Sequence, residues 1–413
     1  MIHINKMFVG IDVAKDSLVA CAMDDQGEDI FHSYSVENNR PGCLKLINLI
    51  ADNANLLQPD IIKIGMEATN VFWEHCYRLI KNHEQLNSNF KLQLYTVNPK
   101  VVSNFKKAYT DLPKNDNVDA WVIADRIRFG RVENSSSPEA LYRALRQITR
   151  HKFKLAQHIK AEKARALNLV FLKFSDFTKK SPFGTFTKAS MALLENYTLR
   201  EIVNTDIHEL AEFLHQNSNN RLGGSTPIEK IITALKKAAR NSYRLKPEID
   251  QAITQTLSMT FDNIRFYQSQ NKRLKRVLKR QLKAIPQTLI TVDGIGPVLT
   301  AGIISEIGDI NRFDKETNLA SYAGLTWSQY QSGSFTAEET HLTKKGNKYL
   351  RYYLVEAANS LRVHNDRYKS YYYKKYNEVP KHKHKRALVL TARKFVRLVF
   401  ALLSKGEIYQ PRR

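Results

Sequence analysis

The stretch MFVGIDV at residues 7–13 decides the fold of the N-terminal region. Its first five residues are apolar or glycine, as expected of a buried strand, and the run then reaches the carboxylate of Asp12. Asp12 is therefore the first candidate for a functional side chain.

The segments around this stretch predict an α/β domain. Alternating or continuous apolar runs, separated by turn residues such as DDQG at 24–27, indicate the order β-β-β-α-β-α-β-α. The predicted elements are strands over residues 7–13, 17–23, 29–36, 61–66 and 91–97, and helices over residues 40–52, 71–81 and 116–129.

This order is typical of the ribonuclease-H-like (RuvC-like) fold, in which the first and fourth strands are neighbours. Asp12 and Glu67 would then face each other, and Asp116 and Asp119 would share one face near the start of the last helix. Four clustered carboxylates repel one another unless a divalent cation is present. Oxygen ligands favour Mg²⁺ or Mn²⁺, and two such ions can assist phosphodiester cleavage.

Each carboxylate also has a purely structural interpretation. Asp12 can begin a turn, Glu67 can cap the following helix, Asp116 can be an N-cap, and Asp119 can complement the helix dipole. Their joint occurrence on a matching strand order favours the metal site.

The composition indicates a nucleic-acid partner. The chain has 64 Lys and Arg against 40 Asp and Glu, a net charge of +24 and a pI near 9.7. With 413 residues it is long enough for two or three domains. Three cysteines without metal-ligand spacing favour a reducing cytoplasm, and no apolar run is long enough to span a membrane. We therefore expect a cytoplasmic protein that is associated with nucleic acid and has no membrane partner.

Three domains are predicted, over residues 1–133, 139–284 and 285–413. A polar linker at 132–138 ends the first, and two heptad-compatible helices dominate the second and suggest an antiparallel or an intersubunit coiled coil. Residues 216–227, between these helices, are rich in Asn, Gly and Ser and predict a loop. The basic run at 272–280 can bind a phosphate backbone or be an ordinary solvated face. The apolar positions that carry the spacing are Leu145, Ile148, Leu155, Ile159, Ala166 and Leu169 in the first helix, and Ile253, Leu257, Ile264, Tyr267, Leu274 and Leu278 in the second.

The last third carries TVDGIGP at 291–297, which is typical of the hairpin in a helix-hairpin-helix module. Glycines there would let backbone N–H groups reach a phosphate, although an ordinary Gly-Pro helix connection is equally consistent. QSGS at 331–334 and TKKGNKYLR at 343–351 follow. The candidate nucleic-acid-binding residues are Gly294, Gly296, Lys344, Lys345, Lys348 and Arg351.

These motifs resemble the insertion-sequence transposases of the one-ten type, which are related to the Piv DNA invertases. The resemblance covers nearly the whole chain. Its most specific pieces are GIDVAK at 10–15, GMEAT at 65–69, DNVDA at 116–120, GIGP at 294–297, SG at 332–333, KGN at 345–347 and LR at 350–351.

The resemblance implies a RuvC-like DEDD domain joined through a coiled coil to a C-terminal transposase domain. It implies a catalytic tetrad, with Ser332 as a nucleophile that becomes covalently linked to DNA, and a structured bridge RNA that pairs with donor and target DNA. The tetrad residues are Asp12, Glu67, Asp116 and Asp119.

Three positions depart from the family pattern. Asn115 precedes Asp116 where threonine is commoner, Trp327 stands where many members carry proline, and Gln331 precedes Ser332 where a small residue is frequent. The QSGS sequence alone predicts only a β-turn, because a serine hydroxyl needs a base or a metal to become a nucleophile. Metals held by the tetrad, in the same or a neighbouring subunit, would provide that activation.

We therefore expect a metal-dependent DNA transposase or recombinase that acts through a serine-linked intermediate. A bridge RNA would guide it, and it would work as a homo-oligomer, either a dimer or a tetramer. Two alternatives remain open: a RuvC-like nuclease that uses water as the nucleophile, and a non-catalytic nucleic-acid-binding protein.

Overall fold

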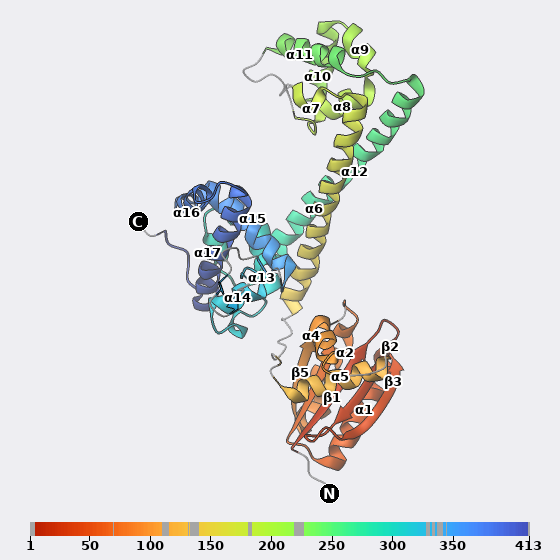
Figure 1. Ribbon diagram of the computed structural model, residues 1–413, viewed down its shortest axis with the longest axis vertical. Coiled ribbons are helices and arrows are strands. Elements are labelled where there is room, and N and C mark those ends of the chain that lie inside the picture. Colours follow the sequence, from red (N-terminus) through yellow and green to blue (C-terminus); the bar gives the residue numbers. More distant parts are fainter. Residues whose placement is uncertain are drawn as a thin grey trace. The chain divides into compact units, whose positions relative to one another are not determined.

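A computed structural model of the chain describes residues 5–68, 70–109, 115–130, 132, 140–180, 184–218, 227–327, 331–332, 335–336, 342–343 and 345–411. The chain divides into two compact units, Met1–Ser137 and Pro138–Arg413 (Figure 1). The predicted three-domain division stays a prediction. No helix in the described ranges is long and apolar enough to cross a membrane.

A five-stranded mixed sheet forms the centre of the first unit, in the order β3-β2-β1-β4-β5. Strand β2 is antiparallel to β1 and β3, whereas β4 is parallel to β1 and β5. The predicted strands are confirmed, and so is the expected contact between the first and fourth. The strands are β1 (Lys6–Val13), β2 (Ser17–Met23), β3 (Asp29–Glu37), β4 (Ile61–Glu67) and β5 (Lys91–Val97).

Helices cover both faces of this sheet. Alternate residues of β1 point to opposite faces: Met7, Val9 and Ile11 join a core with α1 and α2, whereas Phe8 packs with α4 and α5. The three predicted helices are confirmed as α1, α2 and α5, and two short ones were not predicted. The helices are α1 (Arg40–Leu57), α2 (Trp73–Lys81), α3 (Glu84–Asn89), α4 (Pro99–Lys106) and α5 (Asp116–Phe129).

Two long helices, α6 (Ala140–Lys173) and α12 (Pro247–Leu282), pack against each other in the second unit. They are antiparallel, because Leu145 near the start of α6 shares a core with Leu278, whereas Lys173 at its end donates a hydrogen bond to Thr254. All twelve apolar positions predicted to form the seam are buried or half-buried. The pairing is therefore confirmed, and coiled-coil supercoiling stays a prediction.

A small helical module fills the chain between α6 and α12. Its core combines its own apolar side chains with Val170 of α6 and Phe261 of α12. Only residues 216–227 were predicted here, as a loop, and 219–226 lie outside the described residues. The module comprises α7 (Phe177–Lys180), α8 (Lys188–Asn196), α9 (Leu199–Asn204), α10 (Ile207–Asn217) and α11 (Ile228–Asn241).

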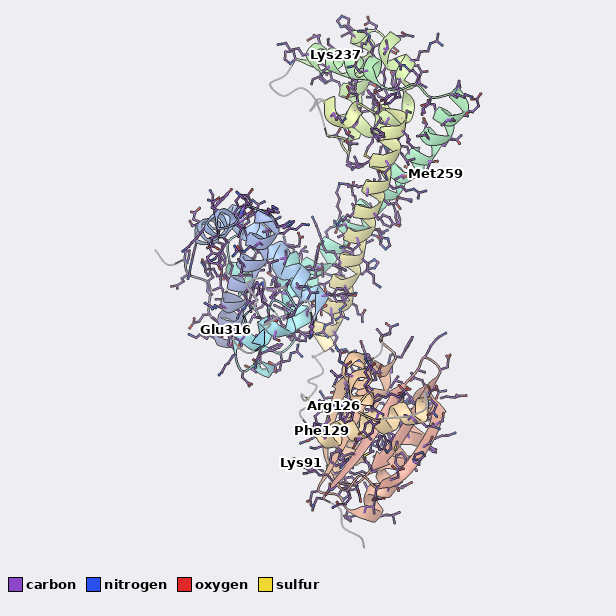
Figure 2. All side chains as sticks on the ribbon, viewed as in Figure 1. Lys91, Arg126, Phe129, Lys237, Met259 and Glu316 are labelled. Carbon is purple, nitrogen blue, oxygen red and sulfur yellow. The ribbon has the colours of Figure 1, made fainter. Side chains whose placement is uncertain are left out.

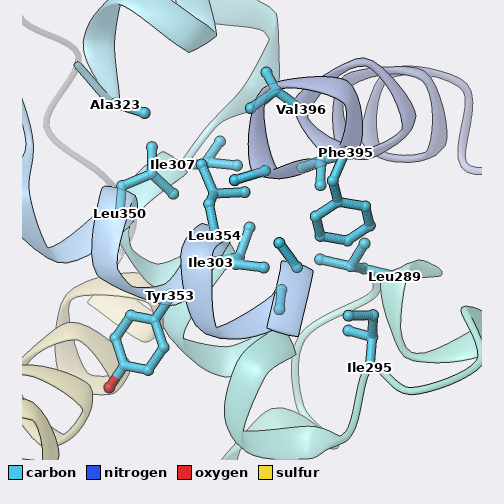
Figure 3. Close-up of a cluster of buried hydrophobic side chains, with 14 of the residues drawn as sticks. Leu289, Ile295, Ile303, Ile307, Ala323, Leu350, Tyr353, Leu354, Phe395 and Val396 are labelled. Carbon is cyan, nitrogen blue, oxygen red and sulfur yellow. The ribbon is translucent and has the colours of Figure 1, made fainter. Parts of the chain in front are cut away.

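The C-terminal part packs around helix α13. Ile303 and Ile307 of α13 contact Leu354 of α15 and Phe395 of α17 in one buried cluster (Figure 3). Gly406, at a φ of 68°, ends α17. The elements are η1 (Leu289–Thr291), α13 (Pro297–Ile307), η2 (Ile310–Arg312), α14 (Glu316–Tyr322), β6 (Gln331–Ser332), β7 (Phe335–Thr336), α15 (Lys348–His364), α16 (Asp366–Asn377) and α17 (Lys383–Lys405).

Candidate active site

Asp12 and Glu67 lie at one edge of the sheet. Strands β1 and β4 are parallel neighbours in a register that pairs Ile11 with Met66, so the two acidic residues follow this pair on adjacent strands. Asp12 accepts a hydrogen bond from the backbone N–H of Val13 at 3.0 Å. The two carboxylates therefore extend from the same ends of the two strands, as predicted.

Helix α5 brings the other two carboxylates to this edge. Asn115 caps the helix by accepting a hydrogen bond from the Val118 N–H at 2.8 Å, so Asp116 and Asp119 both lie in its first turn. The helix packs directly on β1 at Gly10, where a Cβ atom would lie 2.1 Å from the Ala120 carbonyl oxygen. Only glycine permits so close an approach.

The pKa of Asp12 shows that the four carboxylates act on one another. It is raised to about 6, first by burial and then by repulsion from Asp119, Glu67 and Asp116. The hydrogen bond from Val13 opposes this shift. The structure therefore brings the four predicted acidic residues into one electrostatic cluster, called here the acidic cluster.

Lys106, at the end of α4, is a member of this site that the sequence did not reveal. Its Nζ lies 2.6 Å from a carboxylate oxygen of Asp119, and both side chains are partly buried. Nothing in the local sequence distinguishes Lys106 from Lys107 beside it. The lysine therefore forms an ion pair with one carboxylate of the cluster.

The donor set of the acidic cluster fits a hard divalent cation, because all four side chains offer carboxylate oxygens. Burial and then repulsion from the other three carboxylates raise the pKa of Asp12, and a bound cation would stabilise its charged form. Within the described ranges, however, no three Asp, Glu, His or Cys side chains lie close enough together to hold an ion as they stand. Asp119 is also paired with Lys106. Metal binding would therefore require side-chain rotations.

Ser332 lies in the second unit, at the end of the two-residue strand β6. Its backbone pairs with Phe335 of the antiparallel strand β7. The β-turn predicted for QSGS includes residues 333 and 334, which lie outside the described residues. The side-chain surroundings of Ser332 lie outside the described residues. The ends of the longer segment around it are held together by a β-bridge between Trp327 and Leu342 and by a 3.0 Å hydrogen bond between the hydroxyls of Thr326 and Thr343.

A buried ion pair holds Asn347, the N-cap residue of helix α15 after this segment. Glu306 of α13 is fully buried and accepts two hydrogen bonds, at 2.8 and 2.9 Å, from Arg150 of α6. It also accepts one from Asn347, at 2.7 Å, which in turn caps α15. The sequence analysis missed Glu306 and Arg150, although a single acid in the apolar run TAGIISEIG was a usable signal.

The candidate nucleic-acid-binding residues have different surroundings. Gly294 has a φ of +87°, and its carbonyl accepts a hydrogen bond from Ser360, so it lies against α15. Gly296 caps α13 and has open space around it. The helix-hairpin-helix interpretation predicts an α-helix before this hairpin. The structure has instead the single turn of 3₁₀ helix η1, over residues 289–291.

The basic candidates follow the hairpin in sequence. Lys345 and Lys348 are exposed, whereas Arg351 is half-buried and donates a hydrogen bond to the Ala323 carbonyl at 3.1 Å. Lys344 lies outside the described residues. Nucleic-acid binding by all six residues stays a prediction.

Two protein-family models match separate parts of the chain. One, described as a transposase and named for the DEDD residues of IS110, matches residues 9–174. The other, described as the transposase IS116/IS110/IS902 family, matches residues 286–373. The matched ranges contain the acidic cluster and Ser332 respectively.

Several known proteins are similar over most of their length. An uncharacterized 44.8 kDa protein of insertion element IS116 from Streptomyces clavuligerus is 24% identical, over 98% of this chain and 97% of its own. The transposase for insertion sequence element IS1111A of Coxiella burnetii is 24% identical, over 97% and 91%. The pilin gene-inverting protein of Moraxella bovis is 21% identical, over 84% and 80%. Together these matches show that the chain belongs to the IS110 family of transposases.

Proposed function

We propose that this transposase-family protein cuts and rejoins DNA with the acidic cluster as its metal site and Ser332 as the group that becomes joined to DNA. The observation that carries the proposal is the placement of Asp12 and Glu67 at the same ends of neighbouring strands, with Asp116 and Asp119 in the first turn of α5. Burial first, and then repulsion from the other three carboxylates, raises the pKa of Asp12 to about 6. A merely structural aspartate has no need of such neighbours. The strand order β3-β2-β1-β4-β5 supports a RuvC-like domain around the cluster.

Asp12, Glu67, Asp116 and Asp119 would hold Mg²⁺ or Mn²⁺. When bound, such ions polarise the scissile phosphate and stabilise the charge of the leaving oxygen. Asp12 and Glu67 offer their oxygens from adjacent strands, which fixes their spacing, and the first turn of α5 supplies the other two. Lys106, whose Nζ lies 2.6 Å from Asp119, would place a positive charge beside the DNA phosphate at this site.

Ser332 would perform the strand transfer. Its oxygen bonds to phosphorus, the bond between phosphorus and one deoxyribose oxygen breaks, and the serine proton leaves with solvent or that oxygen. A hydroxyl of another DNA strand then attacks the phosphoserine and releases the serine. Bond energy is conserved at both steps, so the reaction needs no external energy source.

The proposal includes RNA and a second copy of the chain. A bridge RNA would select donor and target DNA, and a dimer or tetramer would hold two DNA duplexes together. The net charge of +24 supports polyanion binding. The similar protein of Moraxella bovis is a pilin gene-inverting protein, and inversion of a gene is also a cut-and-rejoin reaction.

The direct test of the metal site is Asp12→Asn, which removes a charged oxygen ligand and keeps the shape of the side chain. We expect recombination in Mg²⁺ to fall by at least about 100-fold, while nucleic-acid binding changes little. Asp52→Asn, at an exposed carboxylate on α1, is the matched control and should keep full activity. Near-normal recombination by Asp12→Asn would contradict the assignment.

The RNA partner is tested by removal. Nuclease digestion of all copurifying RNA should abolish recombination, and adding back the RNA identified by sequencing should restore it. Recombination by RNA-free protein at the normal rate would show that no RNA guides the reaction.

A further inference from the structure

The helical module between α6 and α12 lies outside both family matches, which end at residue 174 and begin again at residue 286. The module nevertheless has a buried hydrophobic core. Leu193, Leu210, Leu235 and Phe261 are all fully buried in its core. A folded module with a core shared with α6 and α12 presents a fixed surface, so its exposed side chains are held in defined places.

Charge is unevenly distributed over this module. Residues 195–212, from the end of α8 into α10, contain five acids and one arginine. Residues 230–247, which include most of α11, contain six lysines or arginines and no acid. The module therefore has an acidic stretch and a basic stretch, and this separation would orient it toward a polyanion.

The cations of the basic stretch face solvent. Helix α11 buries Ile231, Ile232 and Leu235 on its inner side. Lys237, which is labelled in Figure 2, is exposed on the opposite side. Arg240, three residues further along the helix, is exposed as well. Arg244 and Lys246, just after the helix, are also exposed, and within the part of the chain that the structure describes none of these four has a carboxylate partner. Their charge is available to a ligand.

An exposed aromatic residue, Tyr243, lies between Arg240 and Arg244 in the sequence. Tyr243 is 78% exposed, although its backbone is fixed. Its N–H donates a hydrogen bond to the Ser175 hydroxyl at 3.3 Å, and the hydroxyl of the buried Ser242 beside it accepts from the Asp176 N–H and donates to the Ala238 carbonyl. The fold therefore holds the position of an exposed tyrosine between Arg240 and Arg244 in the sequence.

We propose that this surface, called the α11 surface and made of Lys237, Arg240, Tyr243, Arg244 and Lys246, binds single-stranded nucleic acid. The cations neutralise backbone phosphates, and the tyrosine ring stacks on an unpaired base. A duplex offers phosphates but no free base face, so the aromatic ring selects for unpaired nucleotides. The strand is either RNA or displaced DNA, which share this chemistry.

The full-length protein can also bind nucleic acid at other basic surfaces. Site-specific crosslinking tests the proposal because it identifies the residues that contact the strand. Labelled single-stranded RNA carrying 4-thiouridine, single-stranded DNA carrying 4-thiothymidine, and a DNA duplex carrying 4-thiothymidine are each irradiated with the protein. We expect crosslinks at or next to Tyr243 with a single strand and none with the duplex. The strand that crosslinks, RNA or DNA, identifies the source.

Variants then measure the contribution of each group by fluorescence anisotropy with the same strands. Tyr243→Ala should weaken single-strand binding by about five-fold or more. Tyr243→Phe keeps the ring and should bind as tightly as the natural sequence. Lys237→Gln/Arg244→Gln should weaken binding and lower its salt dependence. The matched control Lys188→Gln/Arg200→Gln removes the same charge from exposed positions on α8 and α9 and should change little.

The proposal is overturned if no single strand crosslinks near Tyr243, or if Tyr243→Ala binds both strands as tightly as the natural sequence does. Equal crosslinking by the duplex would also overturn it, because stacking on an unpaired base would then have no role. None of these results depends on Asp12 or Ser332, so the test is independent of the proposed catalytic reaction.

Discussion

At the scale of single residues, Asp12 has a pKa near 6 because it is buried among three other carboxylates. At neutral pH it is therefore ionised at a cost in folding free energy. A divalent cation would remove that cost, which connects the stability of the first unit with its metal site.

This connection predicts a pH-dependent difference between the natural sequence and Asp12→Asn. Between the ordinary pKa of 3.8 and about 6, folded Asp12 keeps a proton that the unfolded chain loses. Stability from this group is thus full below 3.8 and is lost as the pH rises through about 6. Without metal, Asp12→Asn should gain in melting temperature over the natural sequence across this window, by on the order of 2–5 °C.

Thermal melting across this pH range, with and without Mg²⁺, measures the effect. Mg²⁺ at neutral pH should raise the melting temperature of the natural sequence and leave that of Asp12→Asn nearly unchanged. Asp52→Asn should behave as the natural sequence does. Parallel pH profiles for the natural sequence and Asp12→Asn would contradict the electrostatic account.

At the scale of elements, the contact between β1 and α5 decides whether the acidic cluster forms. Gly10 lets the Ala120 carbonyl and the Ala124 amide approach the strand, and this distance sets where Asp116 and Asp119 lie relative to Asp12. The motif GIDVAK thus contains the proposed metal ligand Asp12 and also Gly10, which lets α5 pack closely enough to bring Asp116 and Asp119 to the site.

Gly10→Ala should therefore damage both stability and activity. Its Cβ would lie 2.1 Å from the Ala120 oxygen and 2.4 Å from the Ala124 nitrogen, so α5 must move away. We expect the free energy of unfolding to fall by about 1–3 kcal/mol, with loss of metal-dependent stabilisation. Chemical denaturation measures both, and Gly184→Ala, whose Cβ would meet nothing nearer than 3.8 Å, is the control. Unchanged stability in Gly10→Ala would show that α5 packs less closely.

The elements also show what the sequence could predict. The five strands, the helices α1, α2 and α5, and the seam between α6 and α12 follow from apolar periodicity, which is a local property. The four carboxylates followed from the order of those elements. Lys106 and the Arg150–Glu306 pair were missed. Lys106 lies 13 residues from its partner Asp119, and Arg150 lies 156 residues from Glu306, so no local sequence pattern indicates either contact.

The short helices between α6 and α12 were also missed. Helices such as α9, with six residues, are too short to show a clear period, and tertiary packing stabilises them rather than their own sequence. The glycine and asparagine residues of segment 216–227 predicted a loop there, and residues 219–226 of this segment lie outside the described ranges.

At the scale of the whole molecule, excess positive charge is present along much of the chain. In α12 the run at 272–280 has six exposed cations, and none forms an ion pair within the ranges that the structure describes. The two units carry different parts of the proposed chemistry, the acidic cluster in Met1–Ser137 and Ser332 in Pro138–Arg413. The proposed reaction therefore requires both units to act on the same phosphate, within one chain or between copies.

The formation of a covalent protein–DNA adduct tests this central claim most directly. Labelled DNA is incubated with Mg²⁺, RNA and the natural protein, Ser332→Ala or Asp12→Asn, and the denatured products are separated by electrophoresis. The account predicts a retarded protein–DNA band with the natural sequence only, and no cleavage by either variant, because one lacks the nucleophile and the other a metal ligand. Free cut DNA ends from both the natural protein and Ser332→Ala, without any retarded band, would contradict it and show that water is the nucleophile.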